Sequence, residues 1–141
     1  MLTLEFYKIG EDEMWLPYVE DGVSCGKPSP AYQQVIRRLS LQQELVKNPN
    51  STLYARVCGQ SMIDDGIADN DLLVVDRSLP PESGKIAVCF LDGEFTVKRL
   101  QIDSQGLWLI PANQAYSPIL VTEENHFIIW GIVTHVIKSL A

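Results

Sequence analysis

The pattern of hydrophobic and polar positions changes at residue 52. From there on, short runs rich in valine, leucine, isoleucine and aromatic residues alternate with turn residues. This pattern is typical of a small, mostly antiparallel β-fold. Asp92-Gly93 separates two of the runs and predicts a two-residue hairpin. The predicted strands are 52–57, 72–76, 85–91, 94–101, 107–110 and 126–138.

Two short helices are predicted before the strands. Ser29-Pro30 forms a helix start, and apolar residues follow at helical spacing over 32–39. Ser40 and Gln43 have the form of a capping box, which begins a second helix that ends before Pro49. The residues of this second helix expected to face the core are Leu41, Leu45 and Val46.

The first thirty residues show neither the strand period nor the helix period. They mix acidic residues with scattered aromatics and with proline and glycine. This stretch is expected to pack on a surface, because a disordered tail typically has fewer aromatic residues. We predict an extended N-terminal arm at 1–30, followed by one β core domain at 31–141.

Composition narrows the possible functions. The chain has 141 residues, and its formal net charge of −7 argues against a broad basic face for nucleic acid. We therefore expect protein or peptide partners and no direct sequence-specific binding of DNA. The N-terminus lacks the pattern of a signal peptide, and no stretch approaches the roughly 20 apolar residues of a membrane-spanning helix. A soluble, cytoplasmic protein without a membrane partner is expected.

The cysteines and histidines do not suggest a metal or cofactor site. Cys25, Cys58 and Cys89 form no C-x-x-C pair, which favours reduced thiols. His126 and His135 lack a neighbouring ligand at zinc spacing. The acidic run 64–76 does not fit a calcium-binding loop, because Asn70 stands where that loop needs glycine. A Cys–His peptidase using Cys58 or Cys89 has no motif to support it.

Ser61 and Lys98 are the residues best suited to catalysis. Ser61 follows a predicted strand in Gly59-Gln60-Ser61-Met62, where a glycine turn exposes the hydroxyl. A serine hydroxyl needs a base, and a neutral lysine can serve. Alternation along 94–101 puts Lys98 on the polar side of its strand. It is either a solvated lysine or, if that face is covered, a base whose pKa is lowered by burial.

These residues, together with further segments, resemble the LexA/UmuD family of Ser-Lys self-cleaving peptidases, and within it the UmuD-like branch. Repressors of the LexA type carry a DNA-binding domain where this chain has only the arm, so a repressor is disfavoured. The resemblance implies the family's C-terminal β-fold. The segments that carry it are Ser61-Met62, 64–76, 93–100, 110–113, 115–118 and 130–133.

The resemblance also implies self-cleavage at an Ala-Gly or Cys-Gly bond. The chain has no Ala-Gly, and Cys58-Gly59 belongs to the turn of the nucleophile itself. Cys25-Gly26, in the arm, is therefore the expected scissile bond. The backbone N–H groups of Gln60 and Ser61 are expected to hold the oxyanion.

The family further implies a role in the SOS response to DNA damage. We expect a homodimer, cleavage stimulated by a RecA–single-stranded DNA filament, and a trimmed dimer that assists a UmuC-type translesion polymerase. Two alternatives stay open from the sequence. One is a signal-peptidase-like Ser-Lys endopeptidase, and the other is a non-catalytic polymerase-binding module of the same fold.

Overall fold

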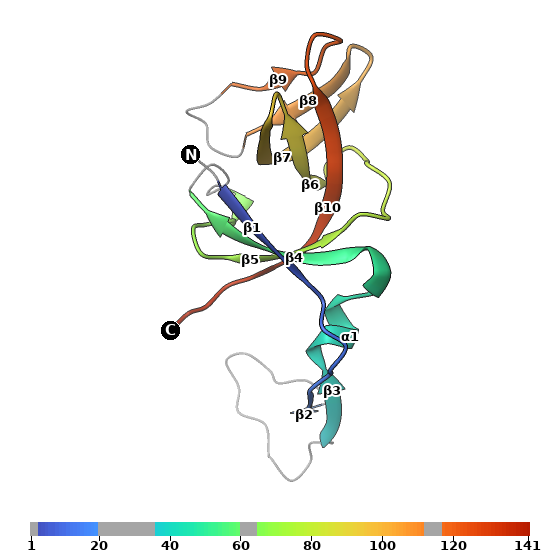
Figure 1. Ribbon diagram of the computed structural model, residues 1–141, viewed down its shortest axis with the longest axis vertical. Helices are drawn as coiled ribbons and strands as arrows, with labels where there is room; N and C mark the ends of the chain where they lie inside the picture. Colours follow the sequence, from blue (N-terminus) through green and yellow to red (C-terminus); the bar gives the residue numbers. More distant parts are fainter. Residues whose placement is uncertain (1–2, 20–35, 60–64, 112–116) are drawn as a thin grey trace, which may run out of the picture. The chain divides into compact units, whose positions relative to one another are not determined.

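The computed structural model describes residues 3–19, 36–59, 65–111 and 117–141, and it divides the chain into two compact units (Figure 1). The sheet unit comprises residues 1–9 and 48–141. The hairpin unit comprises residues 10–47. Each unit is described separately below.

The sheet unit contains one eight-stranded antiparallel sheet in the order β1-β4-β5-β10-β6-β7-β8-β9. A short 3-10 turn at Pro49–Ser51 precedes β4. This architecture confirms the predicted fold class, a mostly antiparallel β-fold with few helices. The strands are β1 (Thr3–Lys8), β4 (Thr52–Cys58), β5 (Leu72–Asp76), β6 (Ile86–Leu91), β7 (Glu94–Asp103), β8 (Gly106–Ile110), β9 (Ile119–Leu120) and β10 (Phe127–Ile137).

The long strand β10 joins the two halves of this sheet (Figure 1). It pairs with β6 through its first part and with β5 through its last part. The register of the β6 pairing shifts between Ile129 and Gly131. A Cβ added to Gly131 would lie 2.6 Å from Cγ1 of Val75, so only glycine fits this close approach without a shift.

All six strands predicted from residue 52 onward are confirmed, with ends that differ by no more than a few residues. The hairpin between β6 and β7 also forms as predicted. Asp92 and Gly93 both have positive φ, 50° and 91°, as a type I′ turn requires. The sequence interpretation did not include β1 or β9.

The hairpin unit contains β2 (Trp15–Val19), β3 (Ile36–Ser40) and α1 (Leu41–Leu45). The first predicted helix is wrong over its last part, because Ile36–Ser40 is a strand that pairs with β2. Helix propensity is a weak preference that a pairing partner overrides. The start of that helix, at Ser29-Pro30, lies outside the described residues.

The second predicted helix is present as α1. The Ser40 hydroxyl accepts a hydrogen bond from the backbone N–H of Gln43 at 3.4 Å, which confirms the predicted cap. Val46 is buried as expected. Leu41 is 60% exposed, so the expectation that it faces the core is wrong. Its position next to the cap leaves it on the outside of a helix of barely more than one turn.

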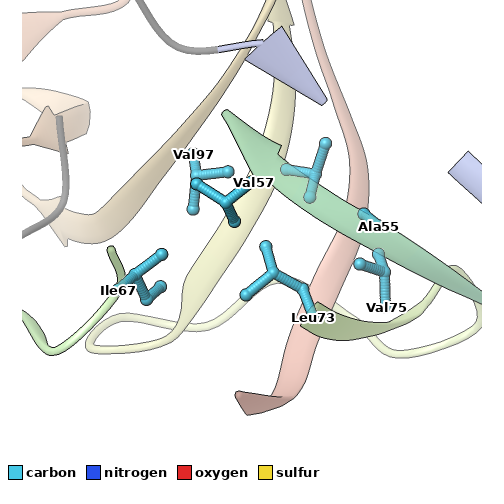
Figure 2. Packing of buried hydrophobic residues seen from close by; sticks show 7 residues of the cluster. Ala55, Val57, Ile67, Leu73, Val75 and Val97 are labelled. Atoms are coloured by element: carbon cyan, nitrogen blue, oxygen red, sulfur yellow. The ribbon is translucent and has the colours of Figure 1, made fainter. Parts of the chain in front are cut away.

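The core of the sheet unit consists of two clusters on opposite faces of β6 and β7. Val88 pairs with Val97 on one face, and Ala87 and Cys89 lie on the other. The first cluster contains Ala55, Val57, Ile67, Leu73, Val75, Val88 and Val97 (Figure 2). The second cluster contains Ala87, Cys89, Leu100, Leu109 and Ile132.

The expected arm contains regular structure at two places. Residues 3–8 form β1 in the sheet unit, and residues 15–19 form β2 in the hairpin unit. The division into an arm that is cut and a core that remains stays a prediction. Within the described ranges, no helix is long and apolar enough to cross a membrane.

Candidate active site

Strand β7 presents Lys98 to a covered face of the sheet. Lys98 pairs with Ala87 on β6, and Cys89, the next residue of β6 on that face, lies diagonally across from it. Both Ala87 and Cys89 are 0% exposed. Lys98 itself is half-buried. These surroundings favour the alternative in which the lysine is partly withdrawn from solvent.

Burial lowers the pKa of Lys98 from its ordinary value of 10.5, because an ammonium loses hydration beside apolar neighbours. The nearby Cys89 acts in the opposite direction, and the desolvation outweighs it. A larger share of Lys98 is therefore neutral near pH 7 than of an ordinary lysine. A neutral amine is the form that can accept a proton.

Cys89 itself is a structural thiol. Burial raises its pKa to about 12, so it stays protonated at neutral pH. Its Sγ lies 3.8 Å from the carbonyl oxygen of Ala87, to which it donates. This environment is the opposite of the one that activates a catalytic cysteine.

The turn that leads to Ser61 begins at Gly59, just after β4. Gly59 has φ of 125°, a conformation that side chains rarely tolerate, and its N–H donates to Asp69 Oδ1 at 3.0 Å. Val57 closes the base of the same loop, with hydrogen bonds to Asn70 and to Asp71 of 2.7 and 2.9 Å. The upstream flank of residues 60–64 is thus fixed by backbone geometry.

The downstream flank of residues 60–64 is tied to β7 at two points. Asp65 Oδ1 lies 3.1 Å from Nη2 of Arg99, the residue after Lys98. Ile67 is buried in the first cluster with Val97, the residue before Lys98 (Figure 2). The downstream flank is therefore held against β7, and on the upstream side Val57 of β4 is buried in the same cluster as Val97.

Several predicted site residues lie outside the described part of the chain: Gln60, Ser61, Cys25 and Gly26. The pairing of Ser61 with Lys98, the oxyanion donors and the scissile bond therefore stay predictions. Sequence reasoning did not single out Asp65 and Arg99, whose ion pair ties residue 65 to β7. The spacing of the pair along the chain gives no local signal that the two residues meet.

Two acids of the run 64–76 have structural roles. Asp76 accepts side-chain hydrogen bonds from Asn48, Ser51 and Ser78. Burial alone would raise its pKa, but these bonds outweigh that effect and the net direction is down. Asp71 is 6% exposed, accepts from the N–H of Ala68 at 2.8 Å, and pairs with Lys138.

These acids hold the ends of β5 in place, which accounts for their clustering without a metal ion. Among the described residues, no group of three or more histidine, cysteine, aspartate or glutamate side chains is arranged to hold a metal.

The described site thus comprises an antiparallel sheet with a half-buried lysine on β7 and a glycine turn at the end of β4. Residues 17–134 match the family described as Peptidase S24-like. The chain belongs to this family of serine peptidases, and its resemblance to LexA/UmuD proteins is confirmed.

The relatives identify the branch more closely. The chain is 40% identical over 121 residues to Protein MucA of Salmonella typhimurium, covering 85% of this chain and 82% of MucA. It is 36% identical over 134 residues to Protein ImpA of Salmonella typhimurium, covering 91% and 87%. The LexA repressor of Alcanivorax borkumensis is 40% identical over 130 residues, which covers 92% of this chain but 61% of the repressor. The chain is thus a UmuD-like member of the family.

Proposed function

We propose that this chain is a self-cleaving serine peptidase in which Ser61 is the nucleophile and Lys98 is the general base. The observation that carries the proposal is the covered position of Lys98, whose pKa is lowered by burial beside Ala87 and Cys89. Membership in the Peptidase S24-like family supplies the class of reaction.

The reaction follows from the chemistry of these groups. Neutral Lys98 takes the proton of Ser61 Oγ, and the oxygen attacks the carbonyl carbon of Cys25. The N–H groups of Gln60 and Ser61 stabilise the resulting oxyanion. The C–N bond then breaks as Lys98 returns the proton to the Gly26 nitrogen. Water hydrolyses the ester, which leaves residues 1–25 and 26–141 as products and restores Ser61.

We further propose that cleavage is a switch in the SOS response. A RecA–single-stranded DNA filament favours the conformation in which Cys25-Gly26 reaches the site, which is a shift between existing conformations. The trimmed cytoplasmic homodimer then serves as accessory subunit of a UmuC-type translesion polymerase. The similarity to MucA and ImpA over most of each chain supports this assignment. The net charge of −7 fits a protein that reaches DNA through partners.

The test is incubation of the purified protein with RecA, single-stranded DNA and nucleotide, followed by intact-mass measurement. We expect two fragments, the larger beginning at Gly26, and no cutting in the Ser61→Ala variant. The control for a substitution away from the site is Lys85→Ala, which removes a lysine from an exposed ion pair with Glu82. This variant should be cut like the natural chain. A natural chain that stays intact would instead indicate a non-catalytic binding module of the same fold. Any other fragment start would relocate the scissile bond.

A further inference from the structure

Strand β1 lies before the proposed scissile bond but is part of the sheet on the other side of it. It pairs with β4 over six residues, from Thr3 opposite Cys58 to Lys8 opposite Leu53. It is the terminal strand at its end of the sheet. Cleavage at Cys25-Gly26 would therefore cut the covalent link to a strand that the sheet still holds.

The inward side chains of β1 complete the first cluster. Leu4 and Phe6 pack against its buried members. The Phe6 ring centroid lies 4.6 Å from that of Trp130 on β10 and 5.1 Å from that of Phe95 on β7. Aromatic pairs at these separations stabilise beyond their buried area. Removing β1 would expose the edge of β4 together with these two aromatic side chains.

The outward side chains of β1 also match β4, in this case by charge. Glu5 lies opposite Arg56 of β4 in the register of the sheet. Opposite charges at directly opposed positions favour the pairing. Tyr7 is 47% exposed, and its hydroxyl donates to Glu5 within the same strand. The sequence that fits this position is thus an apolar residue, an acidic residue and an aromatic residue in succession.

We propose that the position of β1 is a strand-docking site, and that the cut strand is replaced there by an extended segment of a partner protein with the same apolar–acidic–aromatic pattern. This proposal rests on the proposed function, because cleavage makes β1 exchangeable. While β1 is covalently attached, its effective concentration excludes a competing strand. After cleavage, an open strand edge with an apolar groove is the arrangement that adds an extended peptide to a sheet.

The experiment uses the full chain carrying Ser61→Ala, with a recognition sequence for an added protease inserted between Cys25 and Gly26. A labelled peptide of residues 1–12 is the probe, and its fluorescence anisotropy is measured with cut and uncut protein. We expect the cut protein to bind the peptide at least about tenfold more tightly than the uncut protein. A Phe6→Ala peptide should bind about tenfold more weakly, because it loses both aromatic contacts. A Glu11→Ala peptide, altered at an exposed residue beyond the end of β1, should stay within roughly twofold.

Two results would overturn the docking site. One is a cut protein that binds no more peptide than the uncut protein. The other is equal binding of the Phe6→Ala and Glu11→Ala peptides. Because an added protease makes the cut, the outcome is independent of self-cleavage. A failure here would leave the Ser-Lys mechanism standing. A failure of self-cleavage would leave the peptide-binding result unchanged but would remove the event that opens the docking site.

Discussion

Lys98 is a charged residue at a position where burial makes the charge unfavourable. Ala87, which pairs with it on β6, and Cys89, which lies diagonally across, are fully buried. Burial at this position disfavours the ammonium. A pKa below the ordinary 10.5 means that the folded chain binds this proton less tightly than the unfolded chain does. Lys98 therefore lowers stability at neutral pH. Such a cost is typical of residues kept for function.

We predict that Lys98→Met raises the free energy of unfolding near pH 7 by about 0.5–2 kcal/mol and abolishes self-cleavage. Methionine has similar length and no charge to desolvate. The gain should shrink as pH rises through the lowered pKa of the folded state, and it should vanish above 10.5, where the natural lysine is neutral in both states. Thermal unfolding at several pH values measures this. Lys47→Met, at an exposed lysine, is the control and should show no gain. A destabilised Lys98→Met variant would contradict the assigned environment.

At the residue scale, the sequence was sufficient to single out Lys98, because a lysine in an alternating strand can be placed on a face. It was insufficient to show that the face is covered, since that depends on the β6 residues opposite. The Asp65–Arg99 ion pair was also not predictable, because it joins residues far apart in the chain.

At the scale of elements, regular alternation and glycine turns predicted the six strands from residue 52 onward. The β1 strand was missed because Leu4 and Phe6 give only two apolar alternations among acidic and aromatic residues. It is a strand because β4 offers a matching edge. The β3 strand was mistaken for helix for a related reason: its pairing with β2 is a contact between segments that the local pattern does not show.

Strand β10 supplies the prediction at this scale. Gly131→Ala should reduce the free energy of unfolding by about 1–3 kcal/mol, because the new Cβ would lie 2.6 Å from Val75 Cγ1 and force the packed strands apart. Chemical denaturation measures the change. Gly10→Ala is the matched control, since a Cβ at Gly10 meets no atom within 4 Å. Equal stability of the two variants would contradict the close approach of Gly131 to Val75.

At the scale of the whole molecule, the proposed self-cleavage would make this protein its own substrate, once per chain. The sheet unit carries Lys98 and also the residues on either side of the predicted nucleophile's loop. The fragment released by cleavage would include β1, whose departure changes the surface that the sheet unit presents. If both proposals hold, self-cleavage and the binding of a partner would be linked through β1.

The most direct test is the rate of unassisted self-cleavage as a function of pH, followed by intact mass, for the natural chain and for Lys98→Ala. Because neutral Lys98 is the active form, the rate should rise about tenfold per pH unit well below its pKa and level off above it. That plateau should begin below 10.5, since burial lowers the pKa. Lys98→Ala should lose cleavage by about a thousandfold or more at every pH. A flat profile, or cutting that persists in Lys98→Ala, would contradict the assignment of Lys98 as the base.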